Sequence, residues 1–110
     1  MTESELKRIY EGGALWKRYC AKKGAVKKLA KRSDHLRAQC QYTDYGDPPG
    51  VETWGIVELP CSNVLNYGIW EAVRLALIEA CKIAYDSVEF CFTRVCGFDE
   101  NSHCVGEVNF

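Results

Sequence analysis

Four residues near the C-terminus of this 110-residue chain carry side chains that bind soft metal ions. The run Cys91-x4-Cys96-x6-His103-Cys104 brings three thiols and one imidazole close together in the sequence. A zinc ion requires such ligands to converge tetrahedrally. Cys91 and Cys96 are separated by an odd number of residues, so a regular strand would point them to opposite faces. We therefore expect no metal and no cofactor, and keep a cysteine-based metal or redox protein as a second alternative.

Nucleophilic catalysis would need one of the seven cysteines to lie beside one of the two histidines, His35 and His103. No motif in the sequence pairs a particular thiol with a particular imidazole. The sequence also lacks the GxSxG, HExxH, GxGxxG and phosphate-loop patterns that accompany common catalytic chemistries. We therefore predict that the protein is not an enzyme.

The cysteine count and the first residues of the sequence bear on the compartment. Seven thiols cannot all pair with one another, and a chain of this length has enough apolar residues for a core, so we expect reduced cysteines. Residues 1–5 are acidic and polar, unlike the basic start of a secretory signal. No apolar run approaches the roughly 18 to 20 residues that span a bilayer. These features predict a soluble, cytoplasmic protein without a membrane partner.

A basic segment is the clearest candidate for binding a polyanion. Its cations are Lys17, Arg18, Lys22, Lys23, Lys27, Lys28, Lys31 and Arg32. Clustered cations neutralise phosphates and release counterions, which gives affinity for nucleic acids without sequence readout. The same residues would also suit an acidic protein partner or a solvated helix face. A helix-turn-helix around Cys20 and Gly24 is disfavoured because Lys23 occupies a position that the motif fills with an apolar residue.

Charge is segregated along the chain although the formal net charge is only -1. Residues 1–42 hold eleven Lys/Arg and four Asp/Glu, whereas residues 43–110 hold three Lys/Arg and eleven Asp/Glu. An acidic surface on the second half would steer a basic partner towards it. The candidate contacts for a basic partner are Glu71, Glu79 and Asp86. The two halves of one chain, or of two chains in a homodimer, would also be able to neutralise each other.

These features favour a non-catalytic protein-binding module. Small phage or mobile-element proteins that act as adaptors or as stoichiometric inhibitors of nucleic-acid-handling machinery are typically compact and carry both basic and acidic surface regions. The exposed aromatics expected to make the contacts are Tyr42, Tyr45, Trp54 and Tyr67. The alternative is a nucleic-acid-binding protein that contacts phosphates through its basic N-terminal helices.

The elements that position these residues are predicted to form one α+β domain over residues 1–110. Two basic helices are expected within residues 1–42, because the apolar stripe of the first restarts in a new phase after Gly24. Two prolines and two glycines predict a loop at 43–50. The acidic part, 51–110, reads as β-α-β-β: a strand at 51–59, one long helix at about 67–85, a strand at 87–96 and a final strand at 104–110. The prediction is therefore a sheet of about three strands packed on one long helix.

One further pattern concerns the strand at 87–96. Phe90 and Phe92 flank Cys91, an arrangement that invites comparison with the base-stacking strand of RNA-recognition domains. The glycine and the basic residue that such a strand requires are absent from the sequence around them. Two phenylalanines on one face of a strand are expected to belong to the core instead, since a sheet must bury one face against a helix.

Overall fold

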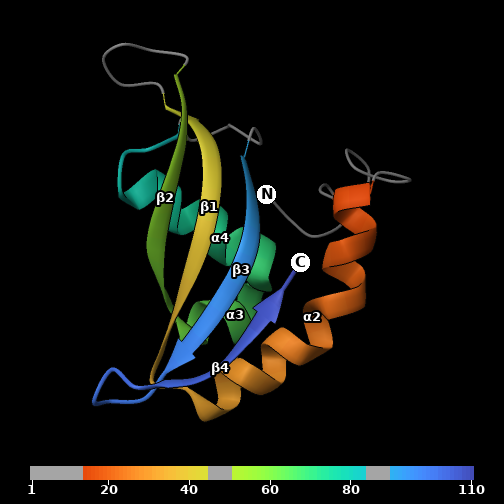
Figure 1. Ribbon diagram of the computed structural model, residues 1–110, viewed down its shortest axis with the longest axis vertical. Helices are drawn as coiled ribbons and strands as arrows, with labels where there is room; N and C mark the ends of the chain where they lie inside the picture. Colours follow the sequence, from red (N-terminus) through yellow and green to blue (C-terminus); the bar gives the residue numbers. More distant parts are fainter. Residues whose placement is uncertain (1–13, 45–50, 84–89) are drawn as a thin grey trace.

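A computed structural model describes residues 14–44, 51–83 and 90–110 of the chain. In these residues the fold is α+β, as predicted, with three helices and a four-stranded antiparallel sheet (Figure 1). The elements are α2 (Ala14–Arg32), β1 (His35–Asp44), β2 (Val51–Pro60), α3 (Cys61–Tyr67), α4 (Ile69–Glu79), β3 (Phe90–Phe98) and β4 (Cys104–Asn109). The strand order is β2-β1-β3-β4, so the sheet has one strand more than the sequence predicted.

The core lies between the helices and one face of this sheet. Alternate residues of the strands turn inward and are almost fully buried, among them Leu36, Ala38 and Cys40 of β1 and Phe92 and Val95 of β3. Helix α4 packs against β2, and α2 packs against β3 and β4. In Figure 1 the helices lie behind and beside the strands, and nothing among the described residues crosses in front. Within residues 14–44, 51–83 and 90–110, the other face of the sheet therefore carries no helical layer.

The prediction of two helices separated at Gly24 is wrong for the described residues. Helix α2 runs without interruption from Ala14 to Arg32, and it also excludes a helix-turn-helix at this place. Within residues 17–23 of this helix the buried residue is Tyr19, not Cys20, and Tyr19 and Val26 are two turns apart on one stripe. With Tyr19 in the stripe, the apolar phase does not change. Residues 1–13, where the first predicted helix begins, lie outside the described part of the chain.

The second predicted helix was expected to continue towards Cys40, but residues 35–44 form strand β1. Leu36 and Cys40 are four residues apart, which places them on one side of a helix and equally on one face of a strand. Ala38 and Tyr42 are also buried, so every second residue from 36 to 42 faces the core, as in a strand. Helix α2 ends at Arg32, where the Ser33 hydroxyl donates a hydrogen bond to the carbonyl of Leu29 at 2.6 Å.

The helix predicted at 67–85 corresponds to α4, which ends at Glu79, and a separate helix that was not predicted, α3, precedes it across Gly68. Gly68 has φ = 86°, a left-handed value that favours glycine, and its N–H donates to the carbonyl of Val64 at 3.0 Å. A Cβ at this position would lie 2.8 Å from the Tyr19 hydroxyl oxygen, so α2 also requires glycine here. This break turns the chain so that α3 and α4 can both pack on the core.

The remaining strands agree with the sequence. The strand at 51–59 and the final strand are confirmed as β2 and β4. Phe90 and Phe92 are buried against Trp70 of α4, with ring centroids 4.6 and 6.0 Å from that of Trp70, as expected for core residues. The predicted loop residues 45–50 and the predicted element ends at 84–89 lie outside the described residues.

Candidate binding surfaces

The face of the sheet that the helices leave open is the first candidate surface. It is formed by the outward-facing residues of all four strands. The strand pairings place them in three rows from β2 to β4: Pro60–His35–Phe98–Cys104, Glu58–Arg37–Cys96–Glu107 and Ile56–Gln39–Arg94–Asn109. Trp54, Gln41 and Cys91 begin a fourth row. We call this surface the open sheet face.

Large apolar side chains on the outer strand are the unusual feature of the open sheet face. The side chain of Trp54 is 55% exposed and that of Ile56 is 70% exposed, and both belong to β2. Successive outward positions of a strand lie on the same face, so these two side chains are neighbours. Val57 and Leu59 on the inward side of β2 are buried, so this strand is apolar on both faces. The two side chains form an exposed apolar patch on β2.

A stacked group of three side chains lies beside this apolar pair, across β1 and β3. The rings of His35 and Phe98 are stacked with centroids 5.5 Å apart and an interplanar angle of 13°. The Arg37 guanidinium lies 4.9 Å from the centroid of the Phe98 ring, within the range of a cation–π contact. Each contact joins a side chain of β1 to the Phe98 ring on β3.

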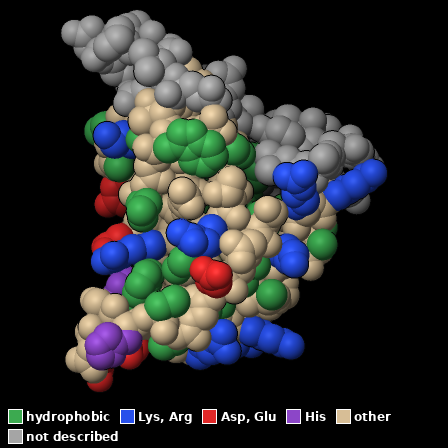
Figure 2. Space-filling model, viewed as in Figure 1, with side chains coloured by type: hydrophobic (Ala, Val, Ile, Leu, Met, Phe, Trp, Pro, Cys, Tyr) green, Lys and Arg blue, Asp and Glu red, His purple; other side chains and the backbone are tan. Residues whose placement is uncertain are grey.

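The charges on the open sheet face are paired. Arg37 Nη2 lies 3.2 Å from Glu58 Oε1, and Arg94 Nη1 lies 3.8 Å from Glu107 Oε2. Figure 2, drawn in the same view as Figure 1, shows hydrophobic side chains over the strands interleaved with charges of both signs. Among the described residues of this face, the two arginines therefore each lie beside a carboxylate of a neighbouring strand.

The thiols at the C-terminal end do not assemble a metal site. Strand β3 has a bulge at Thr93, which has no partner on β1 because Gln39 pairs with Arg94 and the next residue, Cys40, pairs with Phe92. This extra residue places Cys91 and Cys96 on the same face, so the predicted opposite orientation is wrong. Their partners on β1 are four residues apart, which separates them by about 13 Å along the strand. Within the described residues, no group of three or more His, Cys, Asp or Glu side chains is placed to hold a metal ion.

His103 and Cys104, the other two candidate ligands, belong to the turn and the start of β4. His103 Nδ1 lies 3.7 Å from Asp99 Oδ2, and both side chains are accessible to solvent. The other Asp99 oxygen accepts hydrogen bonds from the backbone N–H groups of Asn101 and His103, each at 2.9 Å. The Asp99 carboxylate therefore organises the turn between β3 and β4.

Several of the thiols are held in the neutral form. Burial raises the pKa of Cys40 to about 12, with a smaller contribution from the neighbouring Cys91. Burial also raises the pKa of Cys61, where Asp34 adds to the effect, and that of Cys96, where Arg94 opposes it. A thiol nucleophile needs a lowered pKa, so these three cysteines are poorly suited to covalent catalysis.

Helix α2 is the second candidate surface. The cations predicted from the sequence to bind a polyanion, at positions 17, 18, 22, 23, 27, 28, 31 and 32, all lie on this one helix and are exposed. In Figure 2 the blue side chains gather at the side of the molecule where α2 runs. The salt bridges found among the described residues join other pairs and include neither Lys27 nor Lys31. Direct pairing with the acidic half therefore does not account for these two charges.

The acidic residues expected to meet a basic partner are not placed together on the surface. Glu71 is buried, and both of its carboxylate oxygens accept hydrogen bonds from Arg74, each at 3.0 Å. Its charge is therefore neutralised inside the fold and does not contribute to an exposed acidic patch. Glu79 is exposed at the end of α4, and Asp86 lies outside the described residues.

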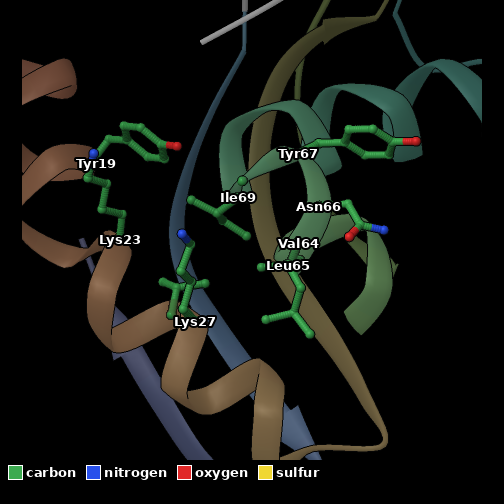
Figure 3. A pocket seen from close by; sticks show the side chains of 10 residues that line it. Tyr19, Lys23, Lys27, Val64, Leu65, Asn66, Tyr67 and Ile69 are labelled. Atoms are coloured by element: carbon green, nitrogen blue, oxygen red, sulfur yellow. The ribbon is translucent and has the colours of Figure 1, made fainter.

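A pocket lies between α2 and the junction of α3 with α4 (Figure 3). Its volume is about 130 Å³, and its apolar floor includes Val26, Val64 and Ile69. Lys27 extends from α2 towards Ile69 and the Tyr19 hydroxyl points away from α2, whereas Lys23 turns back along α2 towards Tyr19. The residues that line this pocket are Tyr19, Lys23, Val26, Lys27, Val64, Leu65, Asn66, Tyr67, Gly68 and Ile69.

Comparison of the chain with protein-family models, with curated proteins and with solved structures finds no match. Within the described residues, no helix is long and apolar enough to cross a membrane.

Of the aromatics expected at an interface, Trp54 and Tyr67 are exposed. The prediction that Tyr42 is exposed is wrong, because its side chain faces the core from β1 and is only 5% exposed. Tyr45 lies outside the described part of the chain. No pattern in the sequence indicated that one surface contains Ile56, His35, Arg37 and Phe98. The exposure of Ile56 could have been predicted, because residues 54 and 56 point to one face of the strand, residues 57 and 59 point to the other, and all four are apolar.

Proposed function

We propose that the protein is a non-catalytic binding module, an adaptor or stoichiometric inhibitor, that docks on a protein partner through its open sheet face. The observation that carries this proposal is the exposure of Trp54 and Ile56 side by side on β2. A single exposed apolar side chain is ordinary, whereas adjacent large ones beside an aromatic–arginine group resemble the anchors of an interface.

The paired charges favour a protein over a nucleic acid at this face. Arg37 and Arg94 each contact a carboxylate of the neighbouring strand, so a phosphate would meet an already neutralised surface. A protein partner that buries Trp54 and Ile56 gains hydrophobic free energy on the order of 25 cal/mol for each Å² of apolar area removed from water. The paired arginines then contribute more to the orientation of the bound partner than to its affinity.

The test replaces the two apolar side chains together. Trp54→Ala combined with Ile56→Ser should weaken partner binding by at least tenfold, because truncating a central interface anchor costs about 2 kcal/mol or more. The matched control is Tyr67→Ala, which removes an aromatic of equal exposure, 56% against 55%, from α3. The partner is identified by quantitative pull-down against both variants, and its affinity is then measured by calorimetry.

The oligomeric state must be measured in the same series by analytical ultracentrifugation. A partner retained equally by all three proteins contradicts the proposal. If the wild type is a dimer that only the Trp54→Ala, Ile56→Ser variant disrupts, the open sheet face binds a second copy of the chain. In that case the adaptor assignment is wrong.

A further inference from the structure

Strand β2 lies at one end of the sheet, and its outer edge pairs with no strand among the described residues. All ten of its residues pair with β1 without a bulge, and the run Val51–Pro60 holds no Lys or Arg. Strand β4, at the opposite end, has six residues and pairs irregularly with β3 at Phe98. Short length, bulges and basic side chains protect an edge strand from pairing with another chain. Strand β2 lacks all three, so its outer edge can accept a further strand.

A groove follows this outer edge, between β2 and the C-terminal end of α4. Its volume is about 290 Å³. The residues that line it are Ile56, Val57, Glu58, Ala76, Glu79 and Ala80. Successive side chains of a strand point to opposite faces, so a hollow lined by three consecutive residues of β2 lies along the edge of the strand. In Figure 1 the end of α4 emerges beside β2 on the side away from β1. We call this hollow the edge groove.

Backbone groups determine the kind of ligand that fits beside the edge groove. In an antiparallel pair, alternate residues direct their N–H and C=O groups towards the partner strand, and the residues between direct theirs away from it. Residues 55–59 of β2 therefore present main-chain groups to the groove. An extended peptide complements such an edge with its own main chain and places alternate side chains on either side of it. The α4 side of the groove carries Ala76 and Ala80, whose small side chains leave room for a strand.

Charge restricts which extended peptide fits. Glu58 and Glu79 line the edge groove, and none of the described residues that line it is a cation. Glu58 already contacts Arg37, whereas Glu79 belongs to none of the salt bridges found among the described residues. A lysine or arginine of an incoming strand can lay its aliphatic stem over Ala80 and place its charge at Glu79. A second copy that paired through the same edge would add the same two carboxylates, so like charges disfavour it.

On the basis of the proposed function, we propose that an extended, basic segment of the protein partner adds to β2 as a fifth strand and occupies the edge groove. Alternate residues of this segment lie beside Trp54 and Ile56 on the open sheet face. The residues between them enter the groove, where a cation meets Glu79. Addition of this strand explains why β2 is apolar on both faces, as strands buried on both faces are. Val57 and Leu59 are buried in the fold, and Trp54 and Ile56 become buried in the complex.

The probe is a fluorescein-labelled octapeptide of alternating lysine and valine with blocked ends. We expect a dissociation constant on the order of 100 μM, measured by anisotropy at about 0.15 M salt to limit diffuse attraction. Alternate N–H groups of a strand point to opposite edges. Methylation of the lysine backbone nitrogens in one peptide, and of the valine backbone nitrogens in another, should therefore abolish binding in only one of the two. Absence of binding by the parent peptide, or equal behaviour of the two methylated peptides, would overturn strand addition.

Variants of the groove provide matched comparisons. Ala80→Trp fills the groove and should weaken peptide binding at least about tenfold, whereas Ala25→Trp, at an exposed alanine of α2, should change it less than about twofold. Glu79→Lys should weaken binding about threefold to tenfold, because a repulsion replaces an attraction. Glu100→Lys makes the same change of charge at an exposed position outside the groove, and screening should limit its effect to less than about twofold. Equal losses within either pair would overturn the site.

The edge groove and the open sheet face can be tested separately. Once the partner is known, its loss by both Ala80→Trp and the Trp54→Ala, Ile56→Ser variant supports strand addition. A partner lost by the Trp54→Ala, Ile56→Ser variant but retained by Ala80→Trp would overturn the edge-groove assignment alone. A partner retained by the Trp54→Ala, Ile56→Ser variant contradicts the proposed function. A dimer that Ala80→Trp disperses in the ultracentrifuge would assign the edge to a second copy of the chain and overturn the basic segment.

Discussion

Arg74 donates two hydrogen bonds to Glu71 from the next turn of α4, one from Nε and one from Nη2, and each is 3.0 Å long. Both side chains are buried, with Arg74 only 3% exposed. The planar guanidinium matches the two carboxylate oxygens, so the pair neutralises itself within the fold. Glu71 therefore has a structural role, and a functional test by charge reversal at this position would unfold the protein before it probed a surface.

We predict that Glu71→Gln lowers the free energy of unfolding by about 3 kcal/mol, because it leaves the Arg74 charge buried without its counter-charge. Urea denaturation followed by circular dichroism measures this change. Glu79→Gln, at the exposed end of the same helix, should change stability by less than about 0.5 kcal/mol. Equal effects of the two substitutions would show that the Glu71–Arg74 pair is not buried as described.

Two glycines should respond to alanine with opposite signs. Gly24 lies inside α2, and a Cβ there would meet nothing within 4 Å, so Gly24→Ala should stabilise the protein by about 0.5 to 1 kcal/mol through helix propensity. A Cβ at Gly97 of β3 would collide with the Ser33 hydroxyl and lie 2.8 Å from Leu29 Cδ1. Gly97→Ala should therefore cost about 1 to 3 kcal/mol through overpacking. Thermal unfolding of both variants provides the comparison, and stabilisation by Gly97→Ala would contradict the packing of α2 on β3.

The elements that could be predicted from the sequence are those with one unambiguous pattern. The β-branched and aromatic run of β2 and the burial of Phe90 and Phe92 belong to this class. Strand β1 was missed because Leu36 and Cys40 fit a helix and a strand equally well, and only its pairing with both β2 and β3 decides between them. Helix α3 was missed, and the Tyr19 hydroxyl that a Cβ at the junction residue Gly68 would meet comes from a distant part of the chain, which local patterns do not encode.

Of the two candidate surfaces, α2 could be predicted from the sequence and the open sheet face could not. The cations of α2 were found from composition alone, because lysines in a helix without acidic neighbours are exposed in almost any fold. The open sheet face was not found, since it depends on which side of the sheet the helices cover. The bulge at Thr93 was equally invisible, because it exists only in the register between β1 and β3. Composition therefore predicts charge, whereas strand register determines which residues meet.

Alkaline pH should destabilise the protein through Cys40. Burial raises the pKa of this thiol from 9.0 to about 12, so the folded state keeps the proton that the unfolded state loses. The stabilising contribution is complete below pH 9 and is lost progressively between pH 9 and 12. Between pH 8 and 10 the wild type should lose about 1.4 kcal/mol more than Cys40→Ala, since each unit of pKa difference corresponds to about 1.36 kcal/mol. Urea titrations of both proteins at pH 8, 9 and 10 measure the difference, and parallel pH profiles would contradict it.

Charge repulsion along α2 should be measurable as stability. Lys23, Lys27 and Lys31 follow one another by four residues, so Lys27→Glu replaces two repulsive contacts by two attractive ones at the same helical spacing. We expect this variant to be more stable than the wild type by roughly 0.5 to 1 kcal/mol at low salt. The gain in stability should vanish at 1 M salt, where the Debye length is about 3 Å. Urea unfolding of both proteins at low and at high salt measures the difference, and a variant that is no more stable than the wild type at low salt would contradict the repulsion between these lysines.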